Sequence, residues 1–241
     1  MSATRLRIED AHAFVLHTYA WRETSLIVEV FARDHGRLPL MAKGARRPGS
    51  LLRGVLMAFQ PLAVSWTGKS EVKTLTGASW QGGQALLAGR GLLCGYYLNE
   101  LILKLLPRED AHPVLFDHYA HTIAALAAGL PTAPLLRSFE FALLRELGYG
   151  LTLDCVADTG ERVRPDSRYV FLQERGLLEA DGDMGDIPLL SGHCLLAMAR
   201  DDFSDTETQA QALGLMRRLL HHHLGGQALE SRRILIELQE L

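Results

Sequence analysis

The residues with the clearest chemical potential form a basic run between positions 37 and 73. Seven Lys and Arg side chains fall in this stretch, against a single acid, Glu71. Cations without nearby counter-charges neutralise phosphates and release counterions, which is typical of a nucleic-acid-binding surface. An ordinary solvated surface is the alternative. We predict that DNA or RNA contacts Arg37, Lys43, Arg46, Arg47, Arg53, Lys69 and Lys73.

Two aromatic residues, Phe59 and Trp66, accompany this basic run. Aromatic side chains stack on unpaired bases with little regard for sequence, so both are candidates for such contacts. Either ring could instead pack in a core. For Trp66 taken alone, core packing is the better interpretation.

Other chemistries find little support in the sequence. The ten histidines include His118 with His121, and the run 221–223, but consecutive side chains on a helix point in different directions and neither group has an accompanying carboxylate motif. Nucleophile elbows, glycine-rich phosphate loops and H-E-x-x-H helices are absent from the sequence. The glycines of Gly89-Arg90-Gly91 are better explained as a helix start or kink. We predict no enzymatic activity, no cofactor and no metal.

Cysteine usage and hydropathy favour an intracellular protein. The three cysteines, Cys94, Cys155 and Cys194, are too far apart to form a redox or zinc motif, so we interpret them as reduced thiols. The hydropathy of the sequence shows neither a secretory leader nor an apolar run long enough to span a membrane. We expect a soluble, cytoplasmic protein that is not associated with a membrane.

The charge is distributed unevenly along the chain. Residues 1–80 contain three Lys and eight Arg against two Asp and four Glu, giving +5, whereas the remaining 161 residues carry −8 within a total of −3. A basic module is therefore followed by an acidic one.

Hydrophobic alternation predicts a small barrel for the basic module. The turn residues lie at 35–36 and 68–70, and the expected strands are Ala13–Tyr19, Ser25–Ala32, Leu38–Lys43, Pro61–Thr67 and Glu71–Ser79. Five short strands fit an OB-fold, and an SH3-like barrel fits almost as well.

Helical spacing begins after Gly82-Gly83 and predicts an α-helical domain. We expect a helix that carries Leu98 and ends before Pro107, followed by helices over 114–128, 133–147, 191–200, 206–224 and 231–241. An irregular segment, 151–188, should contain a hairpin that uses Tyr169–Leu172. The predicted class is α+β, with an OB-fold domain at 1–81 and a helical domain at 82–241.

Several segments in order resemble the bacterial RecO family over nearly the whole chain. In the first part they are Ala13-Phe14-Val15-Leu16, Arg22-Glu23-Thr24-Ser25-Leu26, Ala42-Lys43-Gly44-Ala45-Arg46 and Val72-Lys73-Thr74-Leu75. In the second part they are Tyr97-Leu98-Asn99-Glu100-Leu101, Leu136-Arg137-Ser138-Phe139-Glu140, Leu147-Gly148-Tyr149-Gly150, and Leu224-Gly225-Gly226 followed by Leu229, Ser231 and Arg232.

The resemblance implies a mediator of homologous recombination and DNA repair. Such a protein binds single- and double-stranded DNA, anneals complementary strands, partners RecR, recognises the acidic C-terminal tail of single-strand-binding protein and helps to load RecA. Many family members also hold zinc with four cysteines after the Leu-Gly-Tyr-Gly motif. This chain keeps Cys155 alone in that segment, so we expect hairpin packing in place of a metal.

The tail of single-strand-binding protein would need an apolar groove ending in a cation. We assign this role to Arg137, with Phe141 and Leu144 on the apolar face of the same helix, because a guanidinium suits a carboxylate. An ion pair between Arg137 and Glu140 is the alternative. Two rival functions also remain, an OB-fold module for RNA or ribosomes and a hydrolase that uses scattered histidines.

Overall fold

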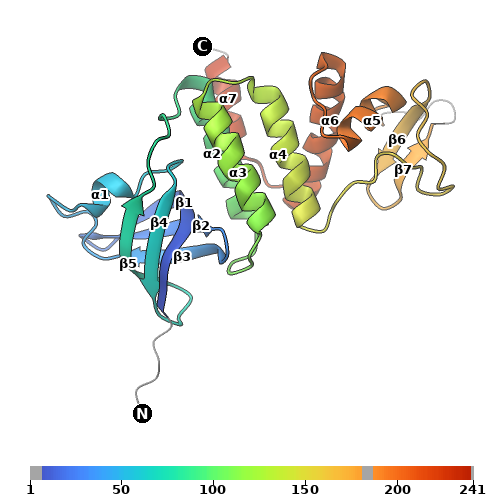
Figure 1. The fold of residues 1–241 in the computed structure, drawn as a ribbon. Coiled ribbons are helices and arrows are strands. Elements are labelled where there is room, and N and C mark those ends of the chain that lie inside the picture. The colour runs from blue at the N-terminus through green and yellow to red at the C-terminus, as the bar shows by residue number, and fades with distance from the viewer. Residues whose placement is uncertain (1–6, 181–186, 240–241) are drawn as a thin grey trace. The chain divides into compact units, whose positions relative to one another are not determined.

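The computed structural model of the protein describes residues 7–180 and 187–239 (Figure 1). These residues form two compact units. One extends to Leu130 and takes in the C-terminal segment from Leu229, and the other runs from Pro131 to Ala228. The first helices after the barrel therefore group with it, and the boundary expected near residue 81 stays a prediction.

A closed five-stranded barrel occupies the first half of the first unit. Its strands are β1 (Arg7–Trp21), β2 (Ser25–Ala32), β3 (Gly36–Ala42), β4 (Leu62–Thr67) and β5 (Lys73–Trp80), joined in the order β1-β2-β3-β5-β4. The β3–β5 pairing is parallel, and the other pairings are antiparallel. A short helix, α1 (Leu52–Val55), lies between β3 and β4. This architecture confirms the predicted OB-fold barrel followed by helices.

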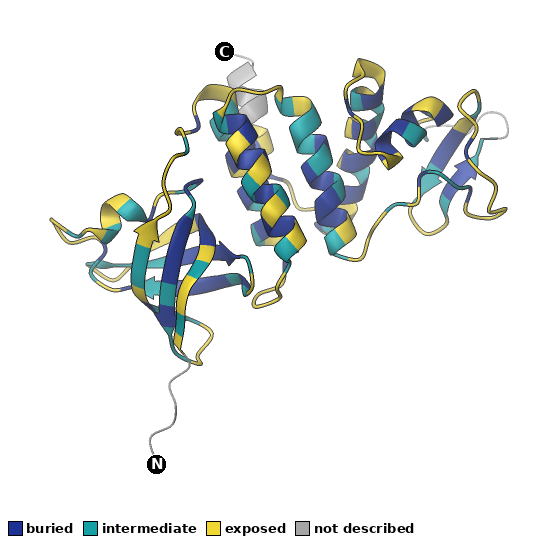
Figure 2. Ribbon diagram, viewed as in Figure 1, coloured by how far each residue is buried: buried dark blue, intermediate teal, exposed yellow. Residues whose placement is uncertain are grey.

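Side chains from all five strands form one apolar cluster inside the barrel. Figure 2 shows which parts of these strands are buried. Val28 and Val30 from β2 and Leu38 and Leu40 from β3 are at most 1% exposed and belong to one apolar cluster. Trp66 lies in the same cluster at 1% exposure, as its core interpretation predicted. Burial of such side chains is the main driving force for closing the barrel.

Helices cover part of the outer barrel surface. The first unit contains α2 (Gly89–Leu105), α3 (Pro113–Ala127) and α7 (Glu230–Gln239), and α2 begins at the Gly89-Arg90-Gly91 segment as expected. Phe14 of β1 and Phe31 of β2 pack against Phe116 and Tyr119 of α3, with ring centroids 5.1–6.1 Å apart. This aromatic contact packs α3 against the barrel.

The second unit combines three helices with a small sheet. Its helices are α4 (Thr132–Glu146), α5 (Gly192–Ala199) and α6 (Thr206–His223). Its strands, β6 (Arg168–Leu172), β7 (Gly176–Glu179) and β8 (Leu190–Ser191), lie in the order β7-β6-β8, which confirms the hairpin predicted at Tyr169–Leu172.

The segment that carries Cys155 is held by apolar packing. Leu153, Val156 and Val163 are at most 5% exposed, beside the buried Tyr169 of β6. Among the described residues no group of three or more His, Cys, Asp or Glu side chains is arranged to hold a metal ion, so the donors present do not fit the four-cysteine zinc site that the resemblance brought into question. Within the same residues no helix is long and apolar enough to cross a membrane.

Candidate nucleic-acid interface

The strongest candidate interface is the basic loop, defined here as residues 43–53, from the end of β3 to the first two residues of α1. The loop is fastened to the β1–β2 turn rather than loosely attached. Ala45 is 1% exposed in the barrel core, the Arg46 amide donates to the Thr24 carbonyl at 2.9 Å, and the Gly44 amide donates to Ser25 Oγ at 3.4 Å. Its cations are therefore presented from a fixed backbone.

Four of the seven predicted cations lie on this loop with exposed side chains: Lys43, Arg46, Arg47 and Arg53. Nη1 of Arg46 donates to the Arg22 carbonyl at 3.2 Å, which leaves its positive charge uncompensated. Across residues 7–180 and 187–239, no ion pair to a carboxylate involves any of these four side chains. Their charge is available to a polyanion.

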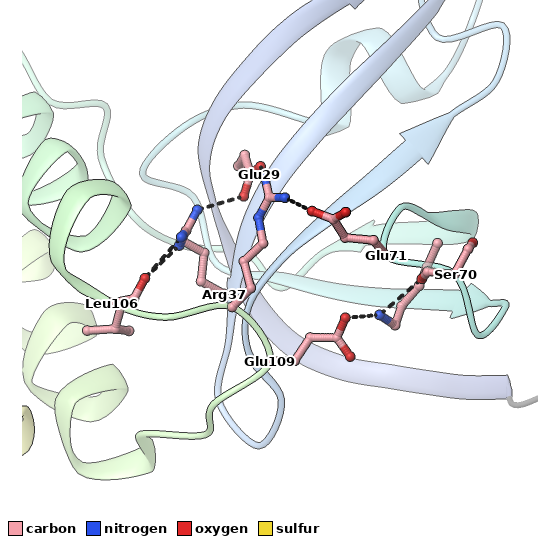
Figure 3. A network of polar contacts seen from close by, with 8 residues as sticks. Glu29, Arg37, Ser70, Glu71, Leu106 and Glu109 are labelled. Carbon is pink, nitrogen blue, oxygen red and sulfur yellow. Dashed lines mark hydrogen bonds and ion pairs between the residues drawn. The ribbon is translucent and has the colours of Figure 1, made fainter.

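Arg37 has a different environment from the basic loop (Figure 3). Its Nε and Nη2 donate to the Leu106 carbonyl at 3.1 and 3.0 Å, and its Nη1 lies 3.4 Å from the carboxylate of Glu29. The Arg37 side chain is 15% exposed and that of Glu29 is 3% exposed. The guanidinium therefore serves to satisfy buried acceptors within the protein.

Lys73 is also used internally. Its Nζ lies 2.5 Å from Oε1 of Glu109 and 3.5 Å from the Ser70 carbonyl, and its side chain is 6% exposed. Figure 3 shows Glu109 reaching this group from the segment that follows α2. The charge of Lys73, on the barrel, is thus neutralised by Glu109, an acid in the segment between α2 and α3.

Arg108 completes the same polar network. It pairs with Glu29 at 2.5 Å and with Glu71, the single acid of the basic run. Burial lowers the pKa of Arg108, but the carboxylates of Glu29 and Glu71 outweigh it and hold that pKa above its ordinary value. The network fastens residues 106–109 to the outer faces of β2 and β3, where an OB-fold often binds its ligand.

The other predicted positions are dispersed. Lys69 is exposed in the turn between β4 and β5, away from the basic loop in sequence. Phe59 and Trp66 are 4% and 1% exposed, so neither ring offers a face to a base. Because both rings are buried, they cannot stack on bases, and the interpretation of Phe59 and Trp66 as stacking residues was wrong. Exposed aromatics occur instead at Tyr19 and Trp21, and β1 extends past the predicted strand end at Tyr19 to include the second of them.

The tail-binding residues proposed on α4 are mostly buried. Nη2 of Arg137 lies 2.6 Å from Oε1 of Glu140, and these side chains are 7% and 1% exposed. Leu144 is 1% exposed, and the ring of Phe141 packs 5.4 Å from that of Phe203. The ion pair considered as the alternative role of Arg137 is thus present.

Comparison with protein-family models assigns both halves of the chain. Residues 6–83 match the model described as recombination protein O, N terminal, and residues 88–233 match that described as recombination protein O, C terminal. The two models together cover the barrel, helices α2 to α6, the small sheet and the start of α7.

Full-length relatives agree with this assignment, and each is named DNA repair protein RecO. The protein of Aromatoleum aromaticum is 58% identical over 235 residues, covering 98% of both chains. That of Azoarcus sp. strain BH72 is 58% identical over 242 residues, covering 99% of this chain and 100% of the relative. That of Ralstonia nicotianae is 55% identical over 236 residues, covering 98% and 86%. The chain therefore belongs to the RecO family of DNA repair proteins.

Proposed function

We propose that this protein is a non-enzymatic recombination mediator that binds single- and double-stranded DNA and anneals complementary strands. The observation that carries the proposal is the basic loop, where exposed and uncompensated cations are held by an anchored backbone. The family assignment supports the same function. The DNA contacts that we propose are Lys43, Arg46, Arg47, Arg53 and Lys69, and we leave out Arg37 and Lys73 because ion pairs already occupy them.

The physical basis of annealing would be charge neutralisation. Two complementary strands repel each other through their phosphates, and Lys and Arg contacts to the backbone reduce that repulsion. Contacts to phosphates leave the base edges free to pair. A protein of this kind needs no bond-making chemistry, since duplex formation is itself favourable once the strands meet.

Protein partners complete the proposed function. We propose that the chain works in the cytoplasm at the nucleoid, with RecR, to load RecA onto DNA coated by single-strand-binding protein. The RecO family assignment supports these partners. The −8 charge of residues 81–241 is compatible with protein recruitment more than with wrapping of DNA.

The function is tested by annealing of complementary oligonucleotides, bare and coated with single-strand-binding protein, at low and moderate salt. The variant is Arg46→Ala/Arg47→Ala, and the charge-matched control is Arg162→Ala/Arg175→Ala, which removes two exposed arginines from the second unit. The slope of log affinity against log salt is negative, and removing one cation that neutralises a phosphate should make it shallower by about 0.7 for single strands. We expect slower annealing and a salt dependence shallower by about 1.4 in the first variant alone.

Two results would overturn this proposal. One is a wild-type protein that neither binds nor anneals DNA. The other is competition in which RNA displaces single-stranded DNA at much lower concentration, which would favour the RNA-binding alternative. Equal losses in both double variants would retain the function but move the DNA surface away from the basic loop.

We also propose that the tail of single-strand-binding protein binds at Arg137, with Phe141 and Leu144 contributing the apolar surface. Because Arg137 is paired with Glu140 at 2.6 Å, the tail carboxylate would have to compete with Glu140. Glu140→Gln keeps the side-chain shape and removes the competing charge, so it should tighten binding of a labelled tail peptide. Arg137→Ala should abolish it, whereas Arg145→Ala, an exposed arginine of α4, should not. Unchanged affinity in Glu140→Gln and Arg137→Ala would leave Arg137 a purely structural role.

A further inference from the structure

Two aromatic side chains remain exposed on the outer surface of the barrel near the basic loop. Tyr19 is 48% exposed and Trp21 is 43% exposed, at the end of β1. Large aromatic rings are usually buried, so two exposed rings on one strand, two residues apart, call for an explanation. Side chains two apart on a strand lie on the same face.

The strand register shows which face this is. In the β1–β2 ladder, Tyr19 is opposite Ile27 and Trp21 is opposite Ser25. Val28 belongs to the barrel core and Leu26 packs against it, so Ile27 between them faces outward. Directly paired residues share a face of the sheet. Tyr19 therefore lies on the outer surface with Ile27 and, through β3, with Met41, which is opposite Ile27.

The two halves of this outer surface differ. Toward one end of β2, Phe31 and its neighbour Phe14 on β1 are covered by rings of α3, and Glu29 is covered by the polar network of residues 106–109. Toward the other end, Tyr19 and Trp21 keep nearly half of their surface exposed. A shift in register between Val15 and His17 separates these two halves of β1.

The exposed rings adjoin the cations of the basic loop. Nη1 of Arg46 donates to the carbonyl of Arg22, the residue that follows Trp21, at 3.2 Å. Lys43 follows directly after Ala42, whose partner in the β2–β3 ladder is Leu26. Apolar ring faces and uncompensated cations therefore meet at one edge of the barrel, which is the combination that single-stranded nucleic acid requires.

We propose that Tyr19 and Trp21 form a base-stacking platform for single-stranded DNA whose phosphates are bound by the basic loop. This inference rests on the proposed function and adds the residues that distinguish unpaired from paired strands. Bases within a duplex are already stacked on one another, so their faces are not accessible to the rings. Stacking would hold a strand until its complement pairs with it, while the base edges stay free.

Binding of a fluorescein-labelled oligothymidylate and of an abasic strand of equal length tests this platform at one salt concentration. The abasic strand has the phosphates but lacks bases. Wild type should prefer oligothymidylate, and Tyr19→Ala and Trp21→Ala should each weaken that binding by about 5- to 30-fold. Binding to the abasic strand and to duplex DNA should change little. Tyr19→Phe and Trp21→Phe, which keep a ring, should restore most of the affinity.

A matched control is Trp80→Ala. Trp80 is another exposed tryptophan of the barrel, at 57%, but it lies opposite Leu62 on β4 and its Nε1 donates to Gln60. We expect the Trp80→Ala variant to bind oligothymidylate with the affinity of wild type. Oligothymidylate should also quench tryptophan fluorescence in Trp80→Phe but not in Trp21→Phe.

The outcomes separate this inference from the proposed function. Equal affinity of wild type for the two strands would overturn the platform and leave phosphate binding intact. A loss in Trp80→Ala as large as that in Trp21→Ala would also overturn it. If wild type bound neither strand, the proposed function itself would fail. Thermal unfolding of every variant shows whether a loss of affinity reflects a loss of fold.

Discussion

Nζ of Lys73 lies 2.5 Å from Oε1 of Glu109, and the Lys73 side chain is 6% exposed. Lys43, in the same basic run, has an exposed side chain and no carboxylate partner among the described residues. Two lysines of the same basic run, which the sequence alone does not distinguish, thus have different environments. One neutralises an acid of the segment after α2, and the other presents its charge to solvent.

This difference predicts opposite effects of one substitution. Lys73→Met should lower the free energy of unfolding by about 1–2 kcal/mol, because a mostly buried charged hydrogen bond is lost while Glu109 stays half-solvated. Lys43→Met should change stability by less than about 0.5 kcal/mol. For DNA affinity the order reverses, and the negative slope of log affinity against log salt should be shallower by about 0.7 in Lys43→Met alone. Urea unfolding and salt-dependent anisotropy measure the two quantities. Weakened DNA binding in a fully stable Lys73→Met would contradict the assignment.

A second prediction concerns Gly36, the first residue of β3. Gly36 has φ +67°, and a Cβ placed there would lie 1.9 Å from the Asp110 carbonyl oxygen. Gly36→Ala therefore combines backbone strain with a backbone clash that flexible side chains cannot relieve. We expect a loss of unfolding free energy of at least about 2 kcal/mol.

Gly49→Ala is the control for this strain. Gly49 has φ +78°, but nothing lies within 4 Å of a Cβ there. The free energy of unfolding should fall by about 1 kcal/mol or less, because the positive φ is the one unfavourable feature of alanine at this position. Urea unfolding followed by circular dichroism compares the two variants. Equal losses would show that the segment at Asp110 moves away from the barrel without cost.

Elements with strong local periodicity were predictable from the sequence. The strand expected at 25–32 is observed with the same bounds, and α6 (Thr206–His223) differs from its expected range by one residue. Local alternation and helical spacing are sufficient there, because both depend on neighbours in the chain. The end of β1 was missed because Ala20 and Trp21 continue the strand only through pairing with Leu26 and Ser25.

The candidate site was less predictable because its limits depend on distant contacts. Arg37 belongs to the basic run in sequence, yet its guanidinium is bound by the carbonyl of Leu106, 69 positions away. Nothing in the pattern around Arg37 indicates that partner. Likewise Phe59 is buried, whereas Trp21 is exposed, a difference set by the tertiary fold rather than by residue type.

A third prediction follows from the irregularity in β1. The register shifts between Val15 and His17, and the carbonyl of Leu16 there accepts a hydrogen bond from Nδ2 of Asn99 at 2.8 Å. Asn99 is 2% exposed and also accepts from the Tyr119 hydroxyl at 2.6 Å. Asn99→Ala removes the donor to a buried carbonyl, so unfolding free energy should fall by about 2 kcal/mol.

Tyr119→Phe is the control, because it leaves the bond from Asn99 to Leu16 in place. We expect a smaller loss, about 1 kcal/mol, when the two variants are compared by urea unfolding. Asn99→Asp should be at least as destabilising as Asn99→Ala, since an ionised carboxylate cannot donate to a carbonyl. Stability of Asn99→Ala within about 0.5 kcal/mol of wild type would contradict the importance of this bond.

The last prediction concerns the link between α2 and α7. The Glu100 carboxylate accepts from the amides of Glu230 and Ser231, both at 2.9 Å, and from the Ser231 hydroxyl at 2.5 Å. It therefore caps the first turn of α7, where free amides and the helix dipole favour an anion. Burial raises the pKa of Glu100, but the hydrogen bonds from Ser231, Glu230 and Lys104 outweigh it and hold that pKa below its ordinary 4.5.

A carboxylate whose pKa is lower in the folded protein stabilises the fold above its unfolded pKa. That contribution is lost as the pH falls through the folded pKa. Glu100→Gln should therefore lower the free energy of unfolding by about 1 kcal/mol at pH 7, and the difference from wild type should shrink below pH 4.5. Lys104→Met is the control, because it leaves the three donors from α7 in place. Urea unfolding from pH 7 to pH 3 measures the difference, and a constant gap over this range would mean that the charge of Glu100 does not stabilise α7.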